Sequence, residues 1–397
     1  MATRSDITIT RLPLCSERAS DQEPPAHHIG SPPTSFRNPW PSSQPIGIAK
    51  VFSTRFLRSA DKNNVPIPAD RKGLVNVQQP DWGVTAPSKL KATWLGHASF
   101  LVETSCSPGQ ARGVRVLLDP VFSERTSPVQ WFGPKRYTPT PCLVDELPEV
   151  DVIAISHNHY DHCDSWTIKE VWRASKERNR TPLIACALGN KVFFTTLLPD
   201  LPAEDVVELD WWHGARLDIT EIGSIDLICT PAQHTSARGP GDKDKSLWCS
   251  WILCEAATED EAIGKRLFFA GDTGYRHVNS AKPTDEEQEN MPSCPAFEEI
   301  GSSYGPFDLA LLPIGLYSPR DFMSSVHCAP EDSVCIHQDI RSKKSIGMHY
   351  GTVRGGISAY YEDVLEPPAR WKVEGEKKGL KWGEDFGLCG IGETVVV

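Results

Sequence analysis

Three histidines and one aspartate lie within the short segment His157-Asn-His-Tyr-Asp-His162. Imidazole and carboxylate groups are ligands that Zn²⁺ prefers, and a catalytic zinc site keeps one position open for water. Two metal ions bound side by side can stabilise both the attacking and the leaving oxygen of a displacement reaction. A chance cluster is improbable, because the chain has only 12 histidines and the aspartate stands at a suitable offset. The pattern H-x-H-x-D-H therefore predicts a two-metal hydrolase.

The segments on either side of this cluster predict the rigid support that a metal site needs. Residues 151–156 form a short apolar run rich in β-branched side chains, which is typical of a buried strand. Apolar residues recur at helical spacing over residues 165–173, which predicts a helix. The cluster would then occupy the loop at the carboxyl end of a strand, where open sheets bind their ligands.

Further metal-binding residue types stand at the ends of other predicted strands. His234 follows the apolar strand 225–229, Asp272 follows 267–270, and His349 ends 345–349. A single His or Asp at a strand end is more often structural than functional. Together with the cluster, however, these residues supply the additional donors that a two-metal centre requires.

From residue 91 onward, short apolar segments with turn signals predict a succession of strands. They are Ala92–Leu95, Ser99–Glu103, Val114–Leu118, Val152–Ser156, Leu183–Cys186, Val206–Leu209, Ile225–Cys229, Trp248–Cys254, Leu267–Ala270, Leu309–Leu312 and Ser345–His349. Helical patterns at about 165–176, 188–198 and 330–341 alternate with them. The metal residues fall on strand-to-helix loops, so we expect an α+β fold, an αβ/βα sandwich of two packed sheets with outer helices.

Residues 1–50 differ in composition from the rest of the chain. They are rich in proline, serine and charge, which predicts a poorly packed, partly disordered N-terminal arm. Within the arm, Trp40 could dock on the body, and His27-His28 is interpreted as a surface pair without a metal role. Residues 51–397 are predicted to form one hydrolase domain with a polar, exposed insertion at about 277–293.

The composition disfavours several classes of protein. The formal net charge is −11, whereas nucleic-acid binding depends on basic surfaces, so no nucleic-acid partner is expected. No segment approaches the roughly 18 to 20 apolar residues that span a bilayer. The N-terminus lacks the apolar core of a secretory signal, so the 12 cysteines are expected to stay reduced. We expect an intracellular, cytoplasmic protein, and Arg4, Arg11 and Arg18 leave a mitochondrial location as an alternative.

The order H-x-H-x-D-H, His, Asp, His resembles the metallo-β-lactamase superfamily, in which these side chains bind two metals. Longer strings resemble the N-acyl-phosphatidylethanolamine-hydrolysing phospholipase D family. They are WLGHASF at 94–100, WFGPKRY at 131–137, SHNHYDH at 156–162, ELDWW at 208–212, GDTGY at 271–275, PAFEEIG at 295–301, GPFDLALLPIG at 305–315 and KKSIGMHYGT at 343–352. The resemblance extends from about Phe36 to about Pro368. The chain departs from the family in its longer arm and in the insertion, which leaves oligomer contacts and regulation open.

The resemblance implies two Zn²⁺ per chain and a set of roles for individual residues. His157, His159 and His234 would hold the first ion, Asp161, His162 and His349 the second, and Asp272 would bridge them. Asp161 and His327 would be catalytic, and Tyr160 and His327 would contact the substrate. The implied reaction is hydrolysis of N-acyl-phosphatidylethanolamine to an N-acylethanolamine and phosphatidic acid. The implied partners are a phospholipid at a membrane surface, reached by peripheral association, and a second copy of the chain in a homodimer.

Some residues near these motifs have a simpler interpretation, and other functions stay open. His97 is more typical of a residue that orients or packs against ligands than of a ligand, and Cys163 of a small buried residue. Lys135 and Arg136 stand beside two aromatic residues and could contact a lipid headgroup, but surface packing is the preferred interpretation. The alternative functions are another hydrolase of the same fold, such as a lactonase or nuclease, and a zinc-bearing lipid-binding protein without turnover.

Overall fold

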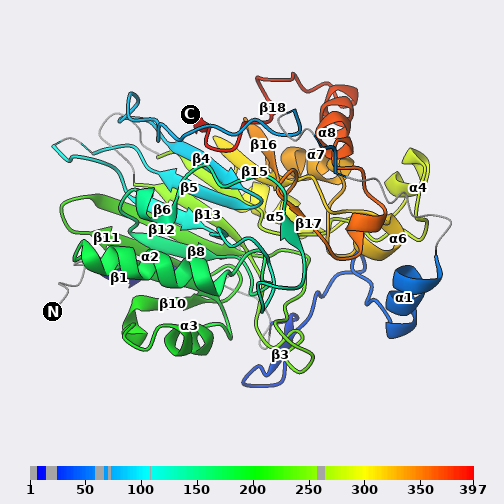
Figure 1. Ribbon diagram of the computed structural model, residues 1–397, viewed down its shortest axis with the longest axis horizontal. Helices are drawn as coiled ribbons and strands as arrows, with labels where there is room; N and C mark the ends of the chain where they lie inside the picture. Colours follow the sequence, from blue (N-terminus) through cyan, green and yellow to red (C-terminus); the bar gives the residue numbers. More distant parts are fainter. Residues whose placement is uncertain (1–6, 15–24, 59–66, 70–72, 108, 257–263) are drawn as a thin grey trace.

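Two mixed β-sheets pack face to face, and helices cover their outer faces (Figure 1). The computed structural model describes residues 7–14, 25–58, 67–69, 73–107, 109–256 and 264–397. The arrangement confirms the predicted α+β sandwich. Every segment that the sequence predicts as a strand forms one, and only the ends differ by one or two residues.

The first sheet has seven strands in the order β10-β9-β8-β6-β5-β4-β19. Their bounds are β4 Lys91–Gly96, β5 Ser99–Glu103, β6 Arg115–Leu118, β8 Val152–Ile155, β9 Leu183–Ala187, β10 Val206–Leu209 and β19 Thr394–Val396. The strands β6, β8, β9 and β10 are parallel, and the other neighbours are antiparallel. The loops that follow β6 and β8 therefore leave the same edge of this sheet.

The second sheet has eight strands in the order β1-β11-β12-β13-β14-β15-β16-β18. Their bounds are β1 Ile7–Arg11, β11 Gly214–Ile219, β12 Gly223–Thr230, β13 Ser250–Glu255, β14 Arg266–Phe269, β15 Leu309–Pro313, β16 Ser345–Met348 and β18 Phe386–Gly387. Two short pairs lie outside the sheets, β2 His28–Ile29 with β3 Ser35–Phe36, and β7 Lys135–Arg136 with β17 Val353–Arg354. The strands β14, β15, β16 and β18 are parallel, so the loops after them share one edge.

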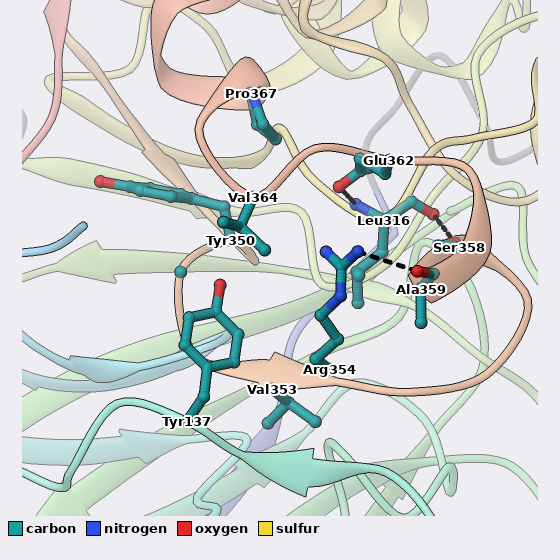
Figure 2. A pocket seen from close by; sticks show the side chains of 11 residues that line it. Tyr137, Leu316, Tyr350, Val353, Arg354, Ser358, Ala359, Glu362, Val364 and Pro367 are labelled. Carbon is teal, nitrogen blue, oxygen red and sulfur yellow. Dashed lines mark hydrogen bonds between the residues drawn. The ribbon is translucent and has the colours of Figure 1, made fainter. Parts of the chain in front are cut away.

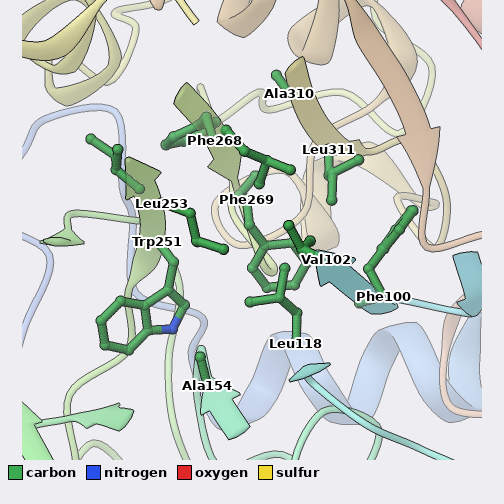
Figure 3. Close-up of a cluster of buried hydrophobic side chains, with 14 of the residues drawn as sticks. Phe100, Val102, Leu118, Ala154, Trp251, Leu253, Phe268, Phe269, Ala310 and Leu311 are labelled. Carbon is green, nitrogen blue, oxygen red and sulfur yellow. The ribbon is translucent and has the colours of Figure 1, made fainter. Parts of the chain in front are cut away.

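The main core fills the space between the two sheets. Figure 3 shows side chains of β5, β6 and β8 facing side chains of β13, β14 and β15, among them Phe100, Leu118, Trp251 and Phe269. A second apolar cluster lies on the outer face of the first sheet, under the helices α2 (Ser165–Glu177) and α3 (Lys191–Leu197). Burying one large apolar side chain contributes about 1.5–3 kcal/mol. Packing on both faces therefore fixes the ends of β6 and β8.

The outer face of the second sheet is covered by α5 (Ala296–Tyr304), α7 (Pro330–Asp339) and α8 (Glu366–Lys377). The short elements are α1 Ile48–Phe52, α4 Asp285–Glu289, α6 Arg320–Met323, the π-helical turn η2 Ser53–Leu57, and the 3₁₀ turns η3 Val144–Glu146, η4 Ala203–Asp205 and η5 Ser358–Tyr360. As predicted, α7 begins at Pro330, and Asp332 Oδ2 accepts a hydrogen bond from the Ala329 N–H at 3.1 Å. Among the described helices, none has both the length and the apolarity to cross a bilayer.

The described part of the N-terminal arm is attached to the body at several points. β1 pairs with β11 at the edge of the second sheet. Lys50, at the end of the arm, forms an ion pair with Asp321, and just beyond the arm Arg58 pairs with the same carboxylate and the Tyr361 hydroxyl donates to Thr54 O at 2.5 Å. The structure differs here from the expected loose packing, because Phe36 belongs to the main core and Trp40 stacks on Trp211, in addition to the polar contacts. The division into an arm and one domain stays a prediction.

The insertion at about 277–293 is mostly exposed, as expected, and contains the short helix α4. Thr284 caps this helix, and the ion pairs Lys377–Asp285 and Lys378–Glu289 connect it to α8. Exposed pairs of this kind contribute little stability. The insertion therefore lies on the helical layer beside α8 (Figure 1).

Candidate metal centre

The predicted metal ligands meet at one edge of the sandwich, where strands of both sheets end. From the first sheet, residues 157–162 follow β8. From the second sheet, His234 follows β12, Asp272 follows β14 and His349 follows β16. The structure thus brings all the predicted ligands into one cluster. Their role as ligands stays a prediction.

The first group of predicted ligands is His157, His159 and His234. His159 Nδ1 lies 2.9 Å from His157 Nε2 and 3.2 Å from His234 Nε2. The three rings are close to perpendicular to one another. One nitrogen of each ring lies within 4.8 Å of the others, a spacing that fits three ligands of one ion.

The second group gathers around the carboxylate of Asp272. His162 Nε2 lies 3.1 Å from Asp272 Oδ2, and His349 Nε2 lies 3.0 Å from Asp272 Oδ1. Asp272 Oδ2 is also 3.8 Å from His234 Nε2, so this carboxylate faces both groups. Asp161 Oδ2 lies 4.0 Å from His162 Nε2. Asp272 therefore occupies the position that a bridging ligand requires.

Asp119, which the sequence analysis did not single out, orients two of the histidines. It follows β6, and its Oδ2 accepts hydrogen bonds from His162 Nδ1 at 2.7 Å and from Ser156 Oγ at 2.5 Å. Ser156 Oγ in turn accepts from His157 Nδ1 at 2.9 Å. Because both Nδ1 atoms donate, the Nε2 atoms of His157 and His162 are left as lone-pair donors. An Asp directly after an apolar strand was the signal available in the sequence.

Backbone carbonyls orient two further histidines. His234 Nδ1 donates to Val326 O at 2.8 Å, and His349 Nδ1 faces Gly315 O at 3.4 Å. The Nε2 atoms of His162 and His349 face each other at only 3.2 Å. Asp272 Oδ1 is buried and has no hydrogen-bond donor within the described structure. Two imidazole nitrogens this close and a buried carboxylate oxygen without a donor are unfavourable unless a cation lies between them. The residues therefore fit bound metal ions.

The electrostatics of the first group and of Asp272 favour metal binding. Burial, together with neighbouring histidines, lowers the pKa of His157 and His234 well below the usual value, and burial also lowers the pKa of His159. Burial opposes ionisation of Asp272, but His162 and His349 outweigh it and hold the pKa of this carboxyl well below its usual range. Neutral imidazoles and an ionised carboxylate are the forms that bind metals. Burial opposes protonation of His162, but Asp272 and Asp119 outweigh it and raise the pKa of His162 well above the usual value, so a metal ion there must displace a proton.

Three predicted site residues, Tyr160, Asp161 and His327, lie at the solvent-facing side of the cluster. The side chains of Asp161 and His327 are 28% and 14% exposed, whereas those of His162 and His349 are fully buried. His327 Nδ1 lies 3.7 Å from Asp272 Oδ2. Burial lowers the pKa of His327 to about 4, so its imidazole is neutral near pH 7. A substrate that reaches the cluster from solvent therefore meets these side chains first.

Arg238 connects the two ends of the loop that contains residues 157–162, although no sequence motif indicated it. Its Nη1 donates to Asn158 O and to Cys163 O, both at 2.8 Å, and so connects the two ends of the loop. Its guanidinium lies 4.0 Å from the centre of the Tyr160 ring, and the Tyr160 hydroxyl donates to Arg238 O. Cys163 is fully buried, in agreement with its interpretation as a small buried residue. The position of Arg238, shortly after His234, was a weak signal.

His97 lies beside Asp161, with its Nε2 3.1 Å from Asp161 Oδ2. Burial lowers the pKa of His97 to about 3, and its carbonyl accepts from the His349 N–H at 3.0 Å. One of its ring nitrogens also lies within 4.8 Å of ligand atoms of His162 and His349. The contacts with Asp161 and His349 agree with the interpretation of His97 as a residue that orients ligands.

A small cavity of about 20 Å³ is lined by Tyr350 and Gly351, which follow His349 in the chain (Figure 2). The Glu362 carboxylate accepts hydrogen bonds from the backbone N–H groups of Leu316, Tyr317 and Ser318. This cavity holds little more than one water molecule. The Glu362 hydrogen bonds hold the turn that follows Gly315, whose carbonyl faces His349. The cavity itself has no room for a lipid.

The structure corrects the interpretation of His27-His28 as a plain surface pair. His27 is only 6% exposed, and each histidine places its Nε2 2.7 Å from one oxygen of Asp210. The preferred interpretation of Lys135 and Arg136 agrees better with the structure. Arg136 donates to Val121 O at 2.6 Å, and Lys135 forms an ion pair with Glu124, so neither cation is free.

The comparisons with known proteins agree with this geometry. Residues 114–350 match the model of the β-lactamase superfamily domain. The chain is 33% identical over 374 residues to N-acyl-phosphatidylethanolamine-hydrolysing phospholipase D 1 of Caenorhabditis elegans. The alignment covers 92% of this chain and 92% of that relative. It is 29% identical over 384 residues to the mitochondrial enzyme of that name from Saccharomyces cerevisiae, which covers 87% of this chain and 72% of the relative.

Solved structures support the fold alone. A possible metal-dependent hydrolase from Veillonella parvula has a TM-score of 0.52 at 15% identity and covers 78% of this chain and 100% of its own. An isothiocyanate hydrolase from Delia radicum gut bacteria has a TM-score of 0.51 at 15% identity, with 77% and 99% covered. Together with the cluster of predicted ligands, the match to the superfamily model and to the curated relatives indicates a metal-dependent hydrolase. The chain belongs to the metallo-β-lactamase superfamily and, within it, to the N-acyl-phosphatidylethanolamine-hydrolysing phospholipase D family.

Proposed function

We propose that the chain is a zinc-dependent phosphodiesterase of the phospholipase D type. Its substrate is N-acyl-phosphatidylethanolamine, and its products are an N-acylethanolamine and phosphatidic acid. The observation that carries the proposal is the double cluster around Asp272, where the first group and the pair His162–His349 face one carboxylate from two sides. Family membership supplies the substrate.

The residues of the chain have distinct roles in this proposal. Two bound zinc ions would supply a hydroxide nucleophile and stabilise charge on the phosphoryl oxygens. Asp161, oriented by His97, completes the second group and is held at the solvent-facing side. His327 is neutral and next to Asp272, so its N–H can donate to a phosphoryl oxygen as charge develops there. Tyr160, half-buried against Arg238, precedes Asp161 in the same loop.

Exposed apolar side chains support a lipid surface as the partner. Phe52, Phe56 and Leu57 on α1 and η2 are 55%, 61% and 67% exposed, and Trp131 and Phe132 are 80% and 69% exposed. The rings of Phe52 and Phe56 contact each other, as do those of Trp131 and Phe132, and contiguous exposed apolar groups mark interaction surfaces. Peripheral association needs such side chains at the depth of the lipid headgroups. A homodimer and a mitochondrial or cytoplasmic location belong to the same proposal, and light scattering and cell fractionation test them.

The decisive experiment uses the purified chain loaded with Zn²⁺ and vesicles that contain N-acyl-phosphatidylethanolamine, in water enriched in ¹⁸O. Attack on phosphorus places the label in phosphatidic acid and leaves the N-acylethanolamine unlabelled. Vesicles of plain phosphatidylethanolamine, a lactone and a nucleic acid are offered in parallel. Turnover of the lactone or the nucleic acid alone would show another hydrolase of this fold. Vesicle binding without product would show a lipid-binding protein.

A further inference from the structure

We propose that His27, His28 and Asp210 form a separate metal site, which binds one divalent transition-metal ion such as Zn²⁺ and fastens the N-terminal arm to the body. The two histidines belong to the arm, at the start of the β2–β3 hairpin, whereas Asp210 follows β10. These residues are not among the ligands of the metal centre. The inference therefore does not depend on the phosphodiesterase proposal.

The geometry of the three side chains converges on one small volume. His27 Nε2 lies 2.7 Å from Asp210 Oδ1, and His28 Nε2 lies 2.7 Å from Asp210 Oδ2. The rings are edge to face, with centroids 4.5 Å apart. One ligand atom of each side chain lies within 4.8 Å of the others. Two imidazoles and a carboxylate are a common set of three protein ligands for zinc, with water as the fourth.

The surroundings hold these ligands in place. The side chains of His27, His28 and Asp210 are 8%, 10% and 10% exposed. The Trp211 ring stacks on His27 with centroids 4.2 Å apart. The backbone N–H of Trp211 donates to Asp210 Oδ1 at 2.8 Å. Phe36 packs edge to face on His28 at 5.6 Å. An apolar shell around three convergent donors strengthens the attraction of a cation for the carboxylate.

The backbone on both sides of the site is also fixed. The Arg37 N–H donates to His27 O, and the His28 N–H donates to Pro25 O, both at 2.9 Å. The two ligands on the arm are therefore oriented before an ion binds. The competing arrangement is a clasp without metal, in which each imidazole donates its Nε2–H to one oxygen of Asp210. The same distances allow it, so counting metal ions decides between the two.

The experiment titrates the metal-depleted full chain with Zn²⁺ under reducing conditions and measures bound metal by mass spectrometry after gel filtration. We compare the wild type with Asp210→Asn, with the double variant His27→Gln/His28→Gln, and with His213→Gln as the control. His213 is an exposed histidine close to Asp210 in the sequence. The expected result is one ion fewer per chain in both site variants than in the wild type and the control. This difference is expected whatever the occupancy of the metal centre.

Circular dichroism and thermal unfolding confirm that each variant folds, and the double variant replaces Asp210→Asn if that one does not. Zn²⁺ should also raise the Tm of the wild type more than that of the site variants, because an ion that binds only the folded arm stabilises it. Equal metal content in all four proteins would overturn the metal site and leave the hydrogen-bonded clasp.

Discussion

Replacing Asp119 by Asn tests whether this carboxylate sets the orientation of the metal ligands. The ionised carboxylate only accepts hydrogen bonds, and it receives the Ser156 N–H, the Ser156 hydroxyl and His162 Nδ1–H. An asparagine has nearly the same shape but brings two N–H donors on one side. Whichever way the amide is turned, it meets the backbone N–H of Ser156 or the ring N–H of His162. In the first orientation the buried Ser156 N–H loses its acceptor, and in the second His162 must rotate or change its tautomer.

The size of the effect follows from these contacts. Loss of a partner that orients a ligand lowers metal affinity by roughly 10- to 100-fold, which corresponds to about 1.4–2.8 kcal/mol. A buried donor without an acceptor lowers the free energy of unfolding by a further ~1–3 kcal/mol. The first effect is measured by competition for Zn²⁺ with a coloured chelator, and the second by denaturant unfolding of the metal-free protein.

Asp151 provides the matched control, because it is equally buried but lies before β8, at the opposite end of the strand. Its carboxylate pairs with Arg112 and Arg180. Asp151→Asn should lower the free energy of unfolding and leave zinc affinity unchanged. The reasoning is refuted if Asp119→Asn binds zinc as tightly as the wild type, or if Asp151→Asn loses as much affinity.

Three further predictions follow from the site and its surroundings. His327→Ala should keep its metal and its Tm while turnover falls by about 10- to 1,000-fold, whereas Asp161→Asn should lose metal as well; equal metal loss in both would contradict the assigned roles. The double variant Phe52→Ser/Phe56→Ser should bind vesicles less tightly but hydrolyse a soluble phosphodiester at the wild-type rate, and Val192→Ser, on the exposed face of α3, should change neither. The metal-free protein should have a lower Tm at pH 5 than at pH 7: the pKa values of the first group are lowered in the folded state, so the unfolded chain takes up more protons as the pH falls below about 6.5. A Tm that is equal or higher at pH 5 would contradict the neutral state of these buried histidines.

The sequence predicts the sandwich and the ligand cluster because both depend on local patterns. Buried strands such as β8 and β14 are continuous apolar runs, and the ligands stand directly after them. β11 was missed because Arg216 and Asp218 interrupt its apolar residues, although alternation in GARLDI is a strand pattern. β1 lies in a segment whose composition suggested an arm, and its pairing with β11 depends on a partner that is remote in the sequence.

The contacts that sequence reasoning missed are those between distant segments. His27 and Asp210 are 183 positions apart, and Asp119 and His162 are 43 apart. Neither pair has a spacing that a local pattern can reveal. The histidines of the arm looked like surface residues because their neighbours in the sequence are polar and proline-rich. Their burial comes from Trp211 and Phe36, which stack on them only in the folded chain.

The attachment of the arm also constrains the order in which the protein can be completed during synthesis. Asn38 donates to the carbonyl of His234, and Gln44 N–H donates to Ser325 Oγ, over separations of 196 and 281 residues. At about 5–20 residues per second, a ribosome needs roughly 10 to 60 s to supply these partners after the arm has emerged. His349 appears later still. The arm can make these contacts only after residues 234 and 325 have been synthesised. The metal centre can therefore be completed only when most of the chain has been made.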